Sequence, residues 1–104
     1  MKVSIVTICF NSAETIRTAL KSVIAQSYPD IEYIIVDGKS KDNTLSIVNE
    51  YKESIAKIIS EEDDGIYDAM NKGVKAATGE VIGILNSDDL YANEHVVSNM
   101  VKAI

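Results

Sequence analysis

Two adjacent aspartates, Asp88 and Asp89, follow a run of apolar residues near the end of the sequence. Neighbouring carboxylates repel each other when both are ionised, and a bound cation relieves that repulsion. Because hard cations prefer oxygen ligands, Mg²⁺ or Mn²⁺ would suit this pair. Such a cation could bridge to a diphosphate and stabilise a departing phosphate. The same residues could cap a turn into the last helix, but their place after residues 81–85 favours a metal site.

Three further aspartates also follow apolar segments. Asp37 ends the run 31–36, and its carboxylate could accept hydrogen bonds from a nucleobase or from ribose hydroxyls. Asp-Gly is also a common turn pair, so the residues themselves leave both interpretations open. Asp63 and Asp64 precede a segment of helical periodicity. Either could contact a base, and helix capping is favoured for one of them.

Three other residues have a structural interpretation beside a functional one. Cys9 is the only cysteine, so no internal disulfide is possible, and its apolar surroundings favour a small buried residue over a catalytic thiol. Lys72 could approach a phosphate, although a solvated helix face is the favoured interpretation. Gly73 lies inside a predicted helix, where glycine is costly unless something packs closely against it.

Short apolar runs alternate with segments of helical periodicity along the chain. We predict strands over 3–9, 31–36, 56–60 and 81–85. We predict helices from Glu14 to just before Tyr28, after an N-cap at Asp42, over 66–77, and over 94–104, with Asn11-Ser12 and Gly79 as capping residues of the first and third. This order predicts an α/β fold, a Rossmann-like parallel sheet of about four strands with helices on both faces and right-handed crossovers.

Ligands of such sheets bind beyond the carboxyl ends of the strands. Polar residues follow every predicted strand at that edge. They are Thr7 and Asn11, Asp37 and Ser40, Asp63 and Asp64, and Asp88 and Asp89. Four such clusters at one edge predict a single binding site.

Composition excludes several classes of protein. The net charge of −6 and the single arginine leave no basic stripe for nucleic acid. The sequence contains no run of about 18 apolar residues, which is the length that would predict a membrane span. We therefore expect a cytoplasmic protein and leave open peripheral attachment at the inner face of the membrane. The dinucleotide-binding motif Gly-x-Gly-x-x-Gly does not occur, and neither does the phosphate-binding loop Gly-x-x-x-x-Gly-Lys-Ser/Thr.

The sequence resembles the family 2 glycosyltransferases, which have the GT-A fold, over nearly its whole length. The similar blocks are residues 3–7 with Asn11, residues 35–44, residues 65–73 with 77–80, and residues 85–89, which resemble an Asp-x-Asp-Asp metal motif. Their order and spacing are more specific than any one block. Two departures stand out: Asn86 replaces the first aspartate of the metal motif, and Gly38-Lys39 replaces Asp-Gly.

The resemblance implies roles for matching residues. Thr7, Asp37 and one of Asp63 or Asp64 would contact a uracil-like base and its ribose, in a nucleotide site that includes Asn11. Asp88 would hold the ribose, and Asp88 with Asp89 would hold Mg²⁺ or Mn²⁺ on the diphosphate. The implied reaction is transfer of a sugar from a nucleotide-sugar donor, expected to be a UDP-sugar, to a saccharide or lipid-linked saccharide hydroxyl with inversion, in polysaccharide biosynthesis.

No residue here matches the general base of the family, which lies downstream of the metal motif. We therefore expect residues 1–104 to form a single nucleotide-sugar-binding domain, the N-terminal portion of a longer enzyme, inactive alone. A receiver-like signalling module is disfavoured, because Cys9-Phe10-Asn11 puts no acid after the first strand. A non-catalytic α/β binding domain that retains only the fold remains the alternative.

Overall fold

The computed structural model describes all residues 1–104 and contains one four-stranded parallel sheet in the order β3-β2-β1-β4. The strands are β1 (Val3–Cys9), β2 (Ile31–Asp37), β3 (Lys57–Ser60) and β4 (Val81–Asn86). All three neighbouring pairs are parallel, with Val3 opposite Ile31 on one side and Val81 on the other. Because β1 and β2 lie inside the sheet, both carry β-branched residues on either face. The predicted α/β class, with a parallel sheet of about four strands, is confirmed.

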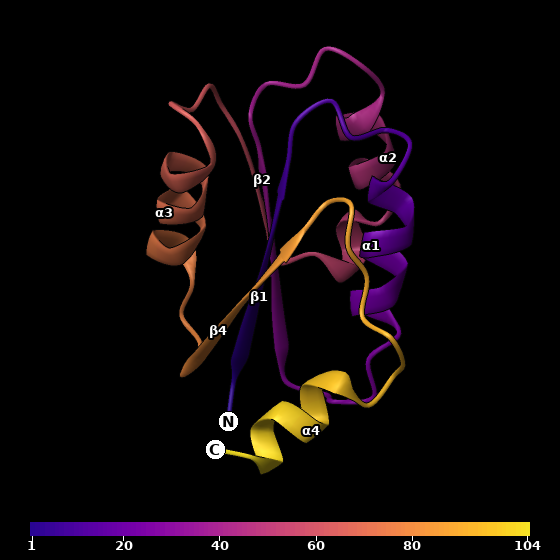
Figure 1. Cartoon of the computed structure of the whole chain (residues 1–104), viewed down its shortest axis with the longest axis vertical. Helices are drawn as coiled ribbons and strands as arrows, with labels where there is room; N and C mark the ends of the chain where they lie inside the picture. The colour runs from indigo at the N-terminus through magenta and orange to yellow at the C-terminus, as the bar shows by residue number, and fades with distance from the viewer.

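Helices cover both faces of the sheet (Figure 1). Helices α1 (Ile16–Ile24), α2 (Thr44–Glu50) and α4 (Val96–Lys102) lie on one side, and α3 (Ile66–Ala76) lies on the other. A short 3₁₀ helix, η1 (Lys52–Ser54), follows α2. The larger core, which includes Leu20, Val48 and Val97, packs between the sheet and the first set of helices. None of the helices is long and apolar enough to cross a bilayer.

The helix starts differ from the predicted ones. Helix α1 begins at Ile16, after an N-cap at Thr15. The carbonyl of Ser12 accepts the amides of Thr15 and Ile16 at 3.0 and 2.9 Å, which forms a turn ahead of the helix. Neither Asn11 nor Ser12 caps the helix through its side chain. Asp42 is not the N-cap of α2, which is Asn43, but its carboxylate accepts the amide of Thr44 at 3.0 Å.

Two glycines are explained by close packing. A β-carbon on Gly73 would lie 2.3 Å from Cγ1 of Val6. The absence of a side chain therefore lets α3 pack directly on β1, which confirms the prediction of a close neighbour. Gly79 is not a C-cap, because α3 ends at Ala76 with Ala77 as its C-cap. It lies instead against β1, where a β-carbon would be 2.8 Å from the Ser4 nitrogen.

Candidate functional site

The loop after β1 is bonded to the loop after β2. Asn11 adopts a φ of 47°, a left-handed conformation that asparagine tolerates better than most residues. Its backbone amide donates to Oγ of Ser40 at 2.8 Å, and its Oδ1 accepts the Lys41 amide at 2.8 Å. These contacts hold together two of the four polar segments that follow the strands.

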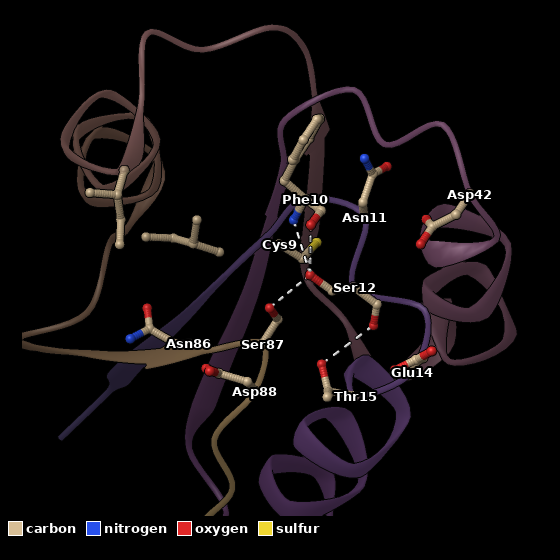
Figure 2. A pocket seen from close by; sticks show the side chains of 12 residues that line it. Cys9, Phe10, Asn11, Ser12, Glu14, Thr15, Asp42, Asn86, Ser87 and Asp88 are labelled. Carbon is tan, nitrogen blue, oxygen red and sulfur yellow. Dashed lines mark hydrogen bonds between the residues drawn. The ribbon is translucent and has the colours of Figure 1, made fainter.

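The loop after β4 joins them through a pair of serines. The hydroxyls of Ser12 and Ser87 lie 2.8 Å apart, although the residues are far apart in sequence (Figure 2). The amide of Ser12 also donates to the hydroxyl of Thr44, at the start of α2. The carboxyl ends of β1, β2 and β4 therefore form one connected polar edge.

A first cavity, of about 580 Å³, opens between the loops after β1 and β4. Asn11 and Asp88, both predicted site residues, line it, and so do Phe10, Ser12 and Ser87 (Figure 2). Glu14, Asp42 and Asp88 contribute the charged side chains of its lining, which contains no lysine, arginine or histidine. The hydroxyl of Thr44 and nearby amides lower the pKa of Asp42 and so favour its charged form. An anion could enter this cavity only with a counter-charge.

A second cavity, of about 700 Å³, lies on the other side of Phe10. The loop after β2 forms one wall, and the acidic loop before α3, residues 61–65, forms the other. Its lining residues are Phe10, Gly38, Lys39, Ser40, Lys41, Glu62, Asp63 and Gly65. Only Phe10 lines both cavities, and its ring is 57% exposed. The two cavities thus adjoin at an exposed aromatic side chain.

Two predicted site residues lie beneath the surface. Thr7 is fully buried, and its hydroxyl lies 2.8 Å from that of Tyr33. Asp37 is also fully buried, and its carboxylate accepts hydrogen bonds from the Ser40 amide and from the hydroxyls of Ser40 and Ser60. Neither side chain has surface that a ligand could reach in this conformation. Asp37 supports the loop after β2, and Thr7 joins β1 to β2.

Cys9 is buried, as predicted, and its thiol lies beside the Asp37 carboxylate. Burial raises the pKa of its thiol far above the ordinary range, and the Asp37 carboxylate raises it further. A thiol held in its neutral form is a poor nucleophile, which agrees with a structural role.

The acidic loop separates the roles of its two aspartates. Asp63 is half-buried and lines the second cavity, while its Oδ1 accepts the Gly65 amide at 3.1 Å, just before α3. Asp64 is exposed and lines neither cavity, and its amide donates to Asp68. The structure therefore places Asp63, not Asp64, on a cavity wall.

Asp88 and Asp89 are both exposed beyond the end of β4, but only Asp88 lines the first cavity. The protein gathers no group of three or more His, Cys, Asp or Glu side chains that could hold a metal ion. A nucleotide-bound Mg²⁺ needs only one or two protein carboxylates, since phosphate and water oxygens complete its shell. The aspartate pair fits a cation that arrives with a diphosphate better than a permanently bound one.

Phe10 and Ser12 line the first cavity but were not predicted from the sequence as site residues. Phe10 is the only phenylalanine and directly follows a buried strand, which was the available signal. Nothing in the sequence pairs Ser12 with Ser87, because that contact depends on the parallel pairing of β1 with β4.

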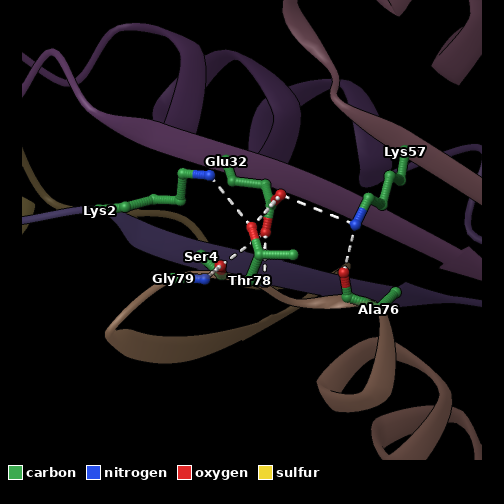
Figure 3. A network of polar contacts seen from close by, with 7 residues as sticks. All are labelled: Lys2, Ser4, Glu32, Lys57, Ala76, Thr78 and Gly79. Carbon is green, nitrogen blue, oxygen red and sulfur yellow. Dashed lines mark hydrogen bonds and ion pairs between the residues drawn. The ribbon is translucent and has the colours of Figure 1, made fainter.

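A separate polar cluster lies at the opposite end of the sheet (Figure 3). Glu32 accepts hydrogen bonds from the hydroxyl of Ser4 and from the amide and hydroxyl of Thr78, each at 2.8 Å. Lys57 lies 3.8 Å from the Glu32 carboxylate and donates to the carbonyl of Ala76. These groups satisfy one another, so the cluster fastens the end of α3 to the sheet.

The fold agrees with the comparisons to known proteins. The model of glycosyl transferase family 2 matches residues 4–104, and the chain belongs to that family. It is therefore a member of a glycosyltransferase family with the GT-A arrangement of its parallel sheet.

Particular relatives carry the same classification. An uncharacterized glycosyltransferase of Mycobacterium tuberculosis is 38% identical over 98% of this chain and 39% of its own length. A PGL/p-HBAD biosynthesis glycosyltransferase of Mycobacterium bovis is 38% identical over 83% of this chain and 35% of its own. The chain thus spans well under half the length of these relatives.

Solved structures show the same fold with ligands. TarS 1-349 of S. aureus in complex with UDP-GlcNAc has a TM-score of 0.90 and 28% identity, covering 98% of this chain and 30% of that one. The mannosyltransferase PcManGT of Pyrobaculum calidifontis, in complex with GDP-Man and Mn²⁺, has a TM-score of 0.90 and 30% identity, covering 97% and 31%.

Proposed function

We propose that residues 1–104 form the donor-binding portion of a glycosyltransferase that uses a nucleoside diphosphate sugar and a divalent cation. In the proposed complex the nucleobase of the donor lies in the second cavity, and its diphosphate lies in the first. The whole enzyme would transfer the sugar to a saccharide or lipid-linked saccharide hydroxyl with inversion. The general base that activates the acceptor hydroxyl would belong to other parts of a longer enzyme.

The charge of the first cavity is the observation that carries this proposal. Its ionisable side chains, Glu14, Asp42 and Asp88, are all acidic. A diphosphate would be repelled from such a lining unless a cation accompanied it. A bound Mg²⁺ or Mn²⁺ would offset the diphosphate charge and stabilise the leaving phosphate. Asp88, which lines the cavity, and the adjacent Asp89 are the carboxylates that would hold it in this proposal.

The arrangement of the two cavities supports the placement of the base. Phe10 stands between them with its ring exposed, and aromatic rings stack favourably on the faces of nucleobases. Asp63 and Glu62 supply hydrogen-bond acceptors on the far wall. A donor that spans Phe10 would use both cavities at once. The solved relatives bound to UDP-GlcNAc and to GDP-Man with Mn²⁺ support this class of ligand.

Calorimetric titration of the folded protein with UDP, with and without Mn²⁺, tests the proposal, and GDP serves as a second probe. We expect binding that requires Mn²⁺ and is weakened about tenfold or more in Asp89→Ala and Asp88→Ala. Asp30→Ala, an exposed aspartate just before β2, is the matched control. Equal metal-dependent binding by wild type and Asp89→Ala would overturn the metal assignment. Failure of the folded wild type to bind either nucleotide would overturn the donor site.

A further inference from the structure

The turn over residues 86–89, which carries both aspartates of the proposed cation site, is anchored by one side chain. The carbonyl of Asn86 accepts the Asp89 amide at 3.0 Å and closes the turn directly after β4. Among these residues only Ser87 makes a side-chain hydrogen bond, and its partner is the hydroxyl of Ser12 (Figure 2). The others are exposed, whereas Ser87 is half-buried. One pair of hydroxyls therefore joins the side chains of this turn to the rest of the protein.

The other hydrogen bonds of Ser12 fix the direction of that contact. A serine hydroxyl has one proton to donate and two lone pairs that accept. The hydroxyl of Ser12 lies 3.1 Å from the carbonyl of Phe10, which can only accept, and 3.1 Å from the amide of Phe10, which can only donate. All three contacts are satisfied only if the hydroxyl of Ser87 donates to Ser12. The hydrogen-bonding capacity of Ser12 is then complete.

This direction favours a positioning role for Ser87 over direct contact with a phosphate. Its hydroxyl proton is directed to Ser12, so it has no proton to donate to a phosphate oxygen, although the residue lines the first cavity. What Ser87 contributes is a fixed attachment point for the turn, one residue before Asp88.

Ser12 is itself held by three neighbouring segments. Its amide donates at 2.7 Å to the hydroxyl of Thr44, which is fully buried at the start of α2. Its carbonyl accepts the amides of Thr15 and Ile16 ahead of α1. Its hydroxyl bonds to the backbone of Phe10, whose ring lies between the two cavities. A residue fixed in this way is a rigid support for the turn after β4.

We infer that Ser12 is a positioning residue, which holds the turn over residues 86–89 in a fixed place relative to Phe10 through the hydroxyl of Ser87. This inference rests on the proposed donor site. A turn that is already ordered loses less conformational entropy when a nucleoside diphosphate and its cation bind. Without the Ser12 hydroxyl, both aspartates would keep their charges but lose their fixed position. Loss of such a supporting contact around metal ligands typically costs about ten- to a hundredfold in affinity.

The first measurement needs no ligand. Nitrogen relaxation by NMR gives order parameters for the amides of residues 87–89. We expect about 0.85, the value of rigid backbone, in the wild type and less than about 0.6 in Ser12→Ala. Ser12→Thr, which keeps a hydroxyl, should restore the wild-type values. Ser98→Ala is the matched control, because its half-buried hydroxyl donates to the carbonyl of His95 in α4, at the other end of the sheet (Figure 1).

The second measurement is calorimetric titration with UDP in the presence of Mn²⁺. Ser12→Ala and Ser87→Ala should each weaken binding about tenfold. The double variant should bind no more weakly than either single variant, because both changes break the same contact. Ser12→Thr should recover most of the affinity, and Ser98→Ala should bind as the wild type does.

The two measurements separate this inference from the proposed function. Unchanged order parameters in folded Ser12→Ala would overturn the inference whether or not a nucleotide binds. A turn that becomes mobile without any loss of affinity for UDP, or losses that add in the double variant, would overturn the role of the serine pair in binding while the donor site stands. If folded wild type with a rigid turn binds neither UDP nor GDP in the presence of Mn²⁺, the proposed function fails, and the role of Ser12 in donor binding fails with it.

Discussion

The hydroxyl of Ser60 donates a hydrogen bond to the carboxylate of Asp37 across 3.0 Å, and this contact joins the last residues of β3 and β2. The same carboxylate accepts the amide of Ser40 at 3.1 Å and its hydroxyl at 2.5 Å. Asp37 therefore fixes the start of the loop that forms one wall of the second cavity. Its contribution is to the architecture of the site.

Replacing Asp37 with alanine should lower the free energy of unfolding by about 1–3 kcal/mol, because three donors would lose a buried partner. Ser60→Ala should cost less, about 0.5–1.5 kcal/mol, since Asp37 keeps its contacts with Ser40. Urea denaturation followed by circular dichroism measures both changes. An unaltered unfolding midpoint in Asp37→Ala would contradict this structural role.

Gly73→Ala should destabilise the protein by about 1–3 kcal/mol, although alanine is the better helix former. The new methyl group would lie 2.3 Å from Cγ1 of Val6 and 3.3 Å from Cγ2 of Val36. Adding Val6→Ala removes the nearest obstacle, so the double variant should be more stable than the sum of the two single changes predicts. Thermal unfolding of the four proteins in this cycle measures the coupling. Strict additivity would show that α3 does not press on β1 at this point.

Stability should fall in acid as Glu32 gains a proton. Burial acts to raise the pKa of Glu32, but hydrogen bonds from Thr78 and Ser4 and the charge of Lys57 lower it from 4.5 to about 2. A carboxyl whose pKa is lower in the folded state stabilises that state above its unfolded pKa. This contribution should therefore be lost as the pH falls from about 4.5 to about 2.

Glu32→Gln provides the comparison for that pH dependence. The gap in unfolding free energy between wild type and Glu32→Gln should be widest near neutral pH and should narrow through the same acid range. Urea melts at a series of pH values measure it. A gap that stays constant with pH would mean that the Glu32 charge does not stabilise the fold.

Lys39→Gly should raise the free energy of unfolding by about 1 kcal/mol. Lys39 has a φ of 66°, a left-handed conformation that costs a residue with a β-carbon roughly 1–2 kcal/mol. Lys41→Gly is the matched control, because Lys41 lies in the same loop and has no positive φ. It should lower stability slightly by loosening the unfolded chain. Melting temperatures that move in the same direction for both variants would contradict the prediction.

The order of strands and helices could be predicted because apolar periodicity is local. β1 and β2 are short runs rich in apolar, β-branched residues, and α3 carries a spaced apolar face, so each element was recognisable alone. The need for close packing at Gly73 was equally visible, since a helical glycine is costly without a packing reason. Helix starts were less accurate, because Ser12 bonds with Ser87 from a distant strand and does not cap α1.

Which polar side chains face a ligand was harder to predict. Asp37 ends β2 and Asp63 follows β3, but the accessibility of each depends on the direction of its side chain. Thr7 lies on the same face of β1 as Ile5 and Cys9, which pack in the larger core. Asp37 likewise shares its face of β2 with Tyr33 and Ile35. Asp63 reaches the surface because its loop leaves the sheet. The position of Phe10 between the two cavities depends on loops from four different parts of the chain.

The central position of β1 also bears on how the chain acquires its structure during synthesis. Its two neighbours differ greatly in sequence separation, since Ser4 contacts Glu32 across 28 positions and Gly79 across 75. Contacts between distant positions slow folding, because a long loop must close before they form. On the ribosome, β1 and β2 can pair early, while the edge of β1 that receives β4 stays open until residues 81–86 have emerged. We expect docking of β4 to be the slow step in the folding of this sheet.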